Sequence, residues 1–414
     1  MIYANYTVGD NTGHNNVYAS LDIKSMDEWD GEDKEPIFYY DRHDEAIRRV
    51  TFNEFLTFEL WKEFKKNENS KIVINFSDDY LNAINLQKII RTIKIKGLDT
   101  SRIYFVVMDQ QYVKFVTTHL EKHGIKGVNI THFNFLLKNV IAPRNLGITV
   151  DKKFSSLSRN YHPWRAQIYG ELAKKDLLKD FIFSFHNYFP YGGAPEGLDN
   201  SEYPVDLVEE DLKEGKIDTN NKLVKEFLNN IPYTVGIKHA KWNIATYNAI
   251  YSADFHLLIE SHWDCYLGNI WAQAKEDFDE KEFAPTFATE KLWKAVNCKK
   301  PFIAVSTPFW LEGLRNMGYK TFSPFIDETY DTLTNNEDRR KAIVEEVERI
   351  CTLPDDEYQK LLVDIQPIID HNFKLYCKNH MENEAKENYP WMDQFLPFQP
   401  KNMTLPTLTP SIYE

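Results

Sequence analysis

The stretch Thr289-Glu290-Lys291-Leu292-Trp293-Lys294 carries the strongest local signals in the chain. Thr289 is a good N-cap residue, and Glu290 follows it where an acidic residue favours the first turn of a helix. Leu292 and the apolar residues at 295 and 296 have the spacing of one helix face,. The pattern therefore predicts a short helix that begins at Thr289 and ends before residue 300.

Apolar runs flank this helix on both sides. Residues 302–305 predict a buried strand, and residues 254–260 predict another strand that ends in Glu260 and Ser261,. Two parallel strands with a polar loop and a helix start between them form a crevice for an anion, because backbone N–H groups and the helix dipole point into it. Lys291 adds a full positive charge. The alternative is that Glu290 and Lys291 form a solvent-exposed first turn.

The composition is that of a globular chain with several domains. The 414 residues are 43% hydrophobic, which leaves room for two or three domains with cores of their own,. The net charge of −13 argues against a protein that simply coats nucleic acid, although a local basic surface remains compatible with it,.

The four cysteines show no paired metal-binding spacing, which favours a reducing compartment,. No charged and apolar leader and no apolar run of about 20 residues is present,. We therefore expect a soluble protein of the cytoplasm, or of the host cytoplasm if the chain is viral.

Strands and helices alternate over residues 1–150, which predicts an α/β domain with a mostly parallel sheet. The expected strands are 1–8, 37–40, 71–76, 102–108 and 128–131, and the expected helices are 52–64, 86–95 and 113–123. Side chains that follow the carboxyl ends of such strands face the ligand crevice. Asp10, Asp78 and Asp79 follow predicted strands and are the candidates for a catalytic base,.

A second α/β domain is expected over residues 151–365. Its first strand, 154–158, leads into a helix at 166–174 through a loop that contains Arg159 and Arg165. Two arginines at a strand-to-helix turn suit a diphosphate, because guanidinium groups bind phosphate oxygens in a bidentate manner. The alternative is two surface arginines on a solvated loop.

Further elements of this domain are strands at 181–184 and 319–322 and helices at 309–317, 336–351 and 355–378,. The last of these helices and the proline-rich tail, residues 366–414, are expected to pack back on the first domain.

Two segments resemble the α1,3-fucosyltransferase family and related GT-B glycosyltransferases. The first is Phe287-Ala288-Thr289-Glu290-Lys291-Leu292-Trp293, followed by a strand and Ser306-Thr307-Pro308, which is similar to the donor-site signature of that family. The second comprises Ser158, Pro163, Arg165, Tyr169 and Leu172, which match the family's run of Ser, Pro, Arg, aromatic and Leu. The resemblance implies a GT-B fold, in which two Rossmann-like domains face each other across a cleft.

The resemblance also implies roles for individual residues. Arg165 and Lys291 would bind the phosphates of a nucleotide sugar, and Glu290 would bind a ribose hydroxyl. The full expected donor-binding set is Arg159, Arg165, Glu260, Ser261, Thr289, Glu290 and Lys291.

The chain departs from the family pattern in two places. It carries a longer insertion at 262–287, and Ser261 stands where the family has Asn, so the base and sugar of the donor stay open. Asp277-Phe278-Asp279 looks like the Asp-x-Asp metal motif of GT-A transferases. It lies in an acidic run without an apolar strand, so we favour an exposed face and expect neither a metal nor another cofactor.

We therefore expect a metal-independent, inverting glycosyltransferase that uses a nucleoside-diphosphate sugar. The residue usage resembles that of bacteriophage and large-virus transferases, some of which add a sugar, of glucosyl or arabinosyl type, to hydroxymethylated cytosine in DNA. The basic segment 88–96 would suit double-stranded DNA as acceptor, or it is a solvated helix face,. A glycan acceptor, as for a fucosyltransferase, and a non-catalytic module that binds nucleotide sugars are the alternatives.

Overall fold

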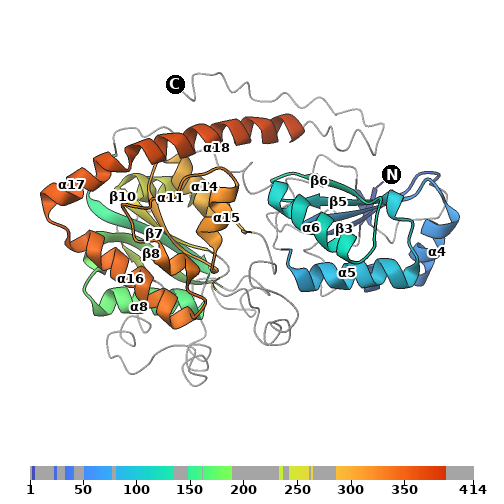
Figure 1. Ribbon diagram of the computed structural model, residues 1–414, viewed down its shortest axis with the longest axis horizontal. Helices are drawn as coiled ribbons and strands as arrows, with labels where there is room; N and C mark the ends of the chain where they lie inside the picture. The colour runs from blue at the N-terminus through green and yellow to red at the C-terminus, as the bar shows by residue number, and fades with distance from the viewer. Residues whose placement is uncertain are drawn as a thin grey trace. The chain divides into compact units, whose positions relative to one another are not determined.

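The computed structural model of the chain (Figure 1) describes residues 2–4, 23–25, 33–41, 51–76, 81–134, 148–160, 162–188, 233–235, 242–260, 263 and 286–387. The chain divides into two compact units. Unit 1 comprises Met1–Asn139, Ala272–Phe287 and His380–Glu414, and unit 2 comprises Val140–Trp271 and Ala288–Asn379. Across the described ranges, no helix combines the length and the apolar character that a bilayer span requires.

The described part of unit 1 contains a six-stranded parallel sheet. Its order is β2-β1-β3-β4-β5-β6, with β1 at Ile2–Ala4, β2 at Ile23–Ser25, β3 at Ile37–Asp41, β4 at Lys71–Phe76, β5 at Ile103–Val107 and β6 at Asn129–His132. The strand order reverses between β1 and β3, which places a topological switch point there. Central strands such as β4 are buried on both faces, which explains their continuous apolar sequences,.

The helices of unit 1 start at side-chain caps and bury one face against the sheet. They are α3 (Phe52–Phe55), α4 (Phe58–Lys66), α5 (Ala83–Lys96) and α6 (Gln110–Lys122), with the 3₁₀ turn η2 at Thr100–Arg102. Thr51, Thr57, Asn82 and Asp109 each accept a backbone N–H of the helix that follows. Asp109 is thus used as a helix cap, and burial raises its pKa to about 6.

Unit 2 contains a second sheet, with five strands among the described residues. The order is β11-β10-β7-β8-β9, with β7 at Lys152–Asn160, β8 at Phe181–Tyr188, β9 at Tyr233–Val235, β10 at Ala253–Ile259 and β11 at Phe302–Val305. Only β9, among these strands, runs antiparallel to its neighbour. β7 pairs with β10 although β8 and β9 lie between them in the chain, so the switch point of this sheet lies between β7 and β10.

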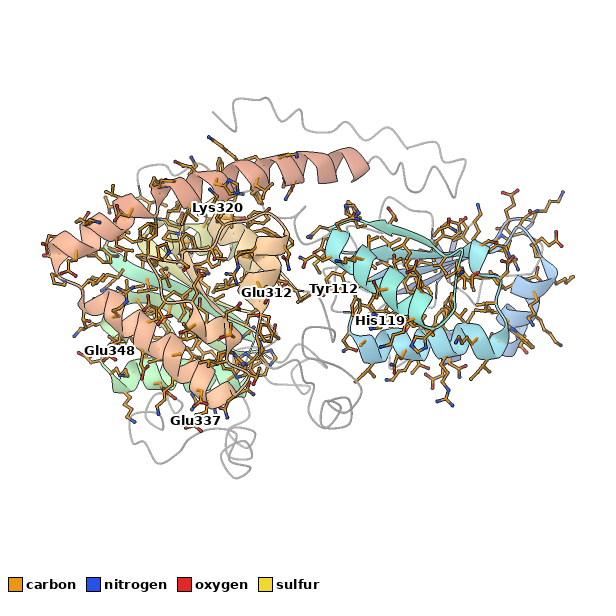
Figure 2. All side chains as sticks on the ribbon, viewed as in Figure 1. Tyr112, His119, Glu312, Lys320, Glu337 and Glu348 are labelled. Atoms are coloured by element: carbon orange, nitrogen blue, oxygen red, sulfur yellow. The ribbon has the colours of Figure 1, made fainter. Side chains whose placement is uncertain are left out.

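The described helices of unit 2 are α8 (Pro163–Lys174), α11 (Trp242–Tyr251), α14 (Glu290–Asn297), α15 (Trp310–Asn316), α16 (Asn336–Thr352), α17 (Asp355–Asp364) and α18 (Gln366–Glu387), with 3₁₀ turns η3 at Leu178–Asp180 and η4 at Thr329–Thr332. The part of α18 from His380 onward is assigned to unit 1. α8 and α16 lie side by side (Figure 1). Two ion pairs join them, from Arg340 Nε to Glu171 Oε1 at 2.6 Å and from Lys175 Nζ to Glu348 Oε2 at 2.5 Å. Glu348 is labelled in Figure 2.

Two α/β units with mostly parallel sheets, the components of a GT-B fold, confirm the expected fold class. The predicted strands 71–76 and 302–305 are confirmed to the residue. The helix expected at 52–64 is interrupted, because Thr57 caps a new helix in its middle.

One predicted strand is wrong. Residues 319–322 form no strand, because the backbone of Lys320 (labelled in Figure 2) is bonded on both its N–H and its C=O by the side chain of Asn372 in α18. A side chain thus supplies the partners that a neighbouring strand would have supplied.

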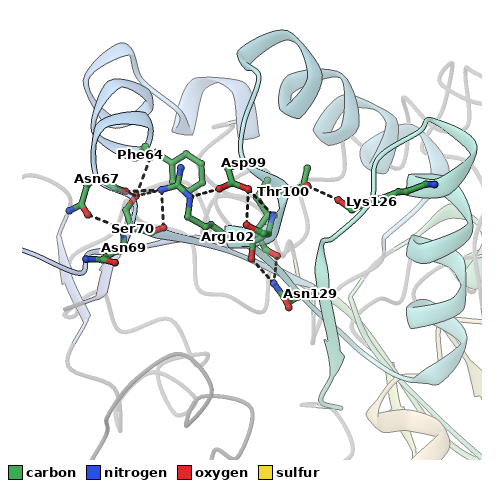
Figure 3. Close-up of polar contacts among 11 residues, drawn as sticks. Phe64, Asn67, Asn69, Ser70, Asp99, Thr100, Arg102, Lys126 and Asn129 are labelled. Carbon is green, nitrogen blue, oxygen red and sulfur yellow. Dashed lines mark hydrogen bonds and ion pairs between the residues drawn. The ribbon is translucent and has the colours of Figure 1, made fainter.

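Arg102 joins the elements at the amino ends of the strands in unit 1 (Figure 3). Its Nη1 donates to the carbonyl of Asn67 at 2.7 Å and to Ser70 Oγ at 3.1 Å, and its Nε donates to Asp99 at 3.1 Å. The guanidinium also lies 4.0 Å from the ring centre of Phe64. These contacts connect α4, the turn before β4 and the turn before β5, so they stabilise the edge of the sheet opposite the carboxyl ends.

We expect Arg102→Met to lower the free energy of unfolding by about 2 kcal/mol, because the half-buried Asn67 carbonyl and the buried Ser70 Oγ each lose a charged donor,. Urea unfolding followed by circular dichroism measures the change. Lys126→Met is the control, since that exposed lysine should contribute less than about 0.5 kcal/mol. Equal stability of the two variants would contradict this account of Arg102.

Candidate donor-binding site

The switch point of unit 2 brings two segments together. β7 leads into α8, which carries Arg165, and the adjacent strand β10 leads directly into Glu260. α14 precedes β11, which pairs with β10 on its other side. Since ligands of open α/β sheets bind outside the carboxyl ends of the strands at such a point, this edge is the expected binding position in unit 2.

Glu260 is the residue that joins these segments. It is 1% exposed, and its carboxylate accepts hydrogen bonds from the backbone N–H of Thr289 at 3.0 Å and from the Thr289 hydroxyl at 2.6 Å. Burial raises the pKa of Glu260, while Lys291 and Thr289 oppose that rise. A buried carboxylate is tolerated only when its oxygens are bonded in this way, so Glu260 and the N-cap of α14 require each other.

Lys291 places its ammonium group above this pair. Its Nζ lies 3.2 Å from Thr289 Oγ1, 3.8 Å from Glu260 Oε2 and 3.5 Å from Glu290 Oε1. The side chains of Lys291 and Glu290 are 20% and 36% exposed, in contrast to Glu260. Lys291 and Glu290 are therefore the charged groups of the cluster that a ligand can reach directly.

Arg165 lies beneath the accessible groups. It is 2% exposed, and its Nη2 donates to the backbone carbonyl of Glu260 at 3.2 Å. Burial lowers the pKa of Arg165 to about 10, and the nearby Tyr169, Glu260 and Glu290 oppose that change, so the guanidinium stays charged at neutral pH. Tyr169 is in turn bonded to Ser156 Oγ at 2.8 Å, which fixes the helix that carries Arg165.

Lys294 is a further charged group of the cluster, and sequence reasoning missed it. Burial alone would raise the pKa of Glu290, but the positive charges of Lys291 and Lys294 outweigh burial and lower it. The position of Lys294, four residues after Glu290 on α14, was the available signal, because side chains at that spacing meet on a helix. With Arg165, the cluster contains three cations and two carboxylates.

This arrangement can hold a phosphate or a diphosphate. The cations exceed the carboxylates, and the N-termini of α8 and α14 lie at the same edge of the sheet, where their dipoles favour an anion. The Glu290 carboxylate is accessible beside them and can accept hydrogen bonds from ligand hydroxyls.

The structure brings together five of the seven residues predicted to bind the donor: Arg165, Glu260, Thr289, Glu290 and Lys291. Arg159 lies in β7, and its side chain is not described. Ser261, the catalytic candidates Asp10, Asp78 and Asp79, and the Asp277/Asp279 pair lie outside the described residues. No group of His, Cys, Asp and Glu side chains suited to a metal occurs in the described part of the chain.

Comparisons with known proteins identify no family: no family model and no curated protein matches the chain. Several solved structures have a similar fold. A trehalose-6-phosphate synthase matches with a TM-score of 0.45 and 9% identity, over 89% of this chain and 75% of that chain. A UDP-forming α,α-trehalose-phosphate synthase from Burkholderia vietnamiensis matches with a TM-score of 0.44 and 8% identity, over 88% and 75%.

A third similar structure is a mutant of S. aureus TarM, solved with fondaparinux, α-GlcNAc-glycerol and UDP. It has a TM-score of 0.37 and 13% identity, over 86% of this chain and 56% of that chain. Likeness at this level does not show a shared activity, so the function rests on the geometry of the site.

His256 lies in β10, in the strand that positions Glu260. It is buried and hydrogen-bonded through Nδ1 to Ser155 Oγ at 2.9 Å. Burial lowers the pKa of His256 to about 3, and the charge of Lys294 adds to the effect. The ring is therefore neutral in the folded protein at any pH near neutrality, which makes His256 a structural residue of the sheet.

This lowered pKa predicts a pH dependence of stability. Below the ordinary pKa of 6.5 the unfolded chain binds a proton at His256 that the folded protein does not bind. The free energy of unfolding should therefore fall by up to about 1.4 kcal/mol per pH unit between about pH 6 and pH 3 on account of this residue. Urea unfolding of the wild type and of His256→Gln at pH 7, 6 and 5 tests this. The free energy of unfolding of the wild type should exceed that of His256→Gln by less as the pH falls, and a constant difference between the two proteins would contradict the prediction.

Proposed function

We propose that the protein is a glycosyltransferase that binds a nucleoside-diphosphate sugar in unit 2. The observation that carries the proposal is the convergence of Lys291, Glu290 and Arg165 around buried Glu260, at the switch point of the sheet. This cluster supplies positive charge for a diphosphate and, directly beside it, a carboxylate for sugar hydroxyls. A site that binds only phosphate would not need the Glu290 carboxylate.

In the proposed reaction, an acceptor hydroxyl oxygen attacks the anomeric carbon of the donor sugar. The bond between that carbon and the diphosphate oxygen breaks, and the electron pair leaves with the diphosphate. Lys291 contacts the diphosphate directly, and the buried guanidinium of Arg165 adds positive charge beneath that contact. Positive charge fixed in place before the reaction stabilises the negative charge that develops on the leaving group.

The proton of the acceptor hydroxyl requires a base. Asp10, Asp78 and Asp79 remain the candidates for this role, and inversion at the anomeric carbon remains part of the proposal. Glu260 is unsuited to the role, because both of its carboxylate oxygens already accept hydrogen bonds from Thr289.

The solvent face of α5 supports a polyanionic acceptor such as DNA with hydroxymethylated cytosine. Lys88, Arg91 and Lys94 are all exposed on this helix, and the helix contains no acidic residue. Basic side chains on one face bind phosphates irrespective of base sequence. A glycan acceptor is the second candidate.

The reaction is tested by incubating the protein with UDP-, GDP- and ADP-sugars together with hydroxymethylated DNA or glycans. We expect mass spectrometry to show release of a nucleoside diphosphate and a sugar mass added to one acceptor class. Binding of a nucleotide sugar without turnover on any acceptor would favour a non-catalytic binding module. Absence of binding to every donor would overturn the proposal.

Lys291→Met tests the phosphate contact. We expect this variant to bind a nucleoside diphosphate roughly 10- to 100-fold more weakly by calorimetry, because a charge-assisted hydrogen bond contributes about 1.5 to 3 kcal/mol. Lys360→Met is a matched control that removes the same charge from α17, where the side chain is 74% exposed. Equal affinity of both variants would contradict the role of Lys291.

A further inference from the structure

Arg339 on α16 is an almost completely buried cation that the proposed reaction does not use. It is 1% exposed. Its Nη2 donates to the backbone carbonyl of Trp263 at 2.6 Å and to Asn336 Oδ1 at 2.6 Å, and its Nη1 donates to the carbonyl of Leu333 at 2.7 Å. Its guanidinium also stacks on the ring of Trp263, 4.0 Å from the centre. Burial of a charge is costly unless its donors are bonded, so the guanidinium and its partners hold each other in place. The chain at Trp263 is therefore fixed against α16.

The fixed segment is the one that leaves the donor-binding site. Trp263 is 3% exposed and lies three residues after Glu260, a distance of at most about 11 Å along the chain. Pairing of β10 holds Glu260 from the preceding side. Arg339 holds the chain from the following side, so that Glu260 lies between two fixed points.

The next residue, Arg340, contacts the other half of the site. Its Nε donates to Glu171 of α8 at 2.6 Å, and Glu171 lies six residues after Arg165 on that helix. Neighbouring arginines of α16 therefore bind both segments that meet at Glu260: the chain after β10 and helix α8.

We propose that Arg339 is a positioning residue for donor binding, and that Arg340 assists it. Arg339 fixes the position of Trp263. This keeps the Glu260 carboxylate in hydrogen-bonding distance of Thr289, and Thr289 starts the helix that carries Glu290 and Lys291. The importance for donor binding rests on the proposed function, whereas the effect on the contact between Glu260 and Thr289 does not.

Hydrogen exchange of the Thr289 amide tests the inference without any ligand, because that amide donates to the Glu260 carboxylate. In Arg339→Met we expect exchange at Thr289 to accelerate roughly tenfold, while the amides of β7 and β10 keep their wild-type rates. Arg340→Met should give a smaller acceleration, and Arg339→Lys an intermediate one. Arg349→Met is the control, since Arg349 lies on the same helix and pairs with Glu346 instead.

If Arg339→Met does not fold, Trp263→Leu removes the ring contact and keeps the backbone carbonyl, and it should give the same selective acceleration at Thr289. Uniform acceleration across unit 2, or unchanged exchange at Thr289 in folded variants, would overturn the inference. Calorimetry with UDP and GDP then separates the two proposals. Binding that weakens about tenfold in Arg339→Met supports both. A wild type that binds neither nucleotide, with Thr289 still affected, would count against the proposed function alone.

Discussion

The arrangement of the candidate site depends on one buried residue. The carboxylate of Glu260 accepts both hydrogen bonds that Thr289 offers, and the backbone carbonyl of Glu260 accepts the guanidinium of Arg165. A carboxylate without partners at 1% exposure would cost several kcal/mol, on the order of the stability of a whole domain. The end of β10, the start of α14 and the start of α8 therefore have to meet in this one geometry. The accessible charges, Lys291 and Glu290, take their positions from it.

The same geometry separates two kinds of charged residue. Arg165 and Glu260 are buried and hold the segments together, whereas Lys291 and Glu290 are accessible and available to a ligand. Burial would raise the pKa of Glu290, but the charges of Lys291 and Lys294 outweigh burial and lower it. Because the structural charges are distinct from the binding charges, substitutions in the two groups should differ in their consequences: loss of stability for the first group and loss of affinity for the second.

Much of the fold, but less of the site, could be predicted from the sequence. Buried strands such as 71–76 and 302–305 are continuous apolar runs, and the N-cap Thr289 marks the start of α14. The contact between Glu260 and Thr289 spans 29 residues, and no local pattern records it. The predicted strands and helix start placed both residues at one crevice, but they did not predict the hydrogen bonds between them. Arg339 could not be found at all, because its partners are largely backbone carbonyls, which leave no trace in the sequence. The strand predicted at residues 319–322 was wrong for a similar reason, since the Asn372 side chain binds backbone groups that a neighbouring strand would have bound.

The central claim is that Lys291 and Glu290, with the charge of the buried Arg165 beneath them, form one binding site for a nucleoside diphosphate. A crystal structure of the protein with UDP or GDP tests it most directly. The account predicts the diphosphate beside Lys291 at the carboxyl edge of β7 and β10, with a ribose hydroxyl bonded to Glu290. A nucleotide bound elsewhere in unit 2, with neither Lys291 nor Glu290 in contact with it, would contradict the claim.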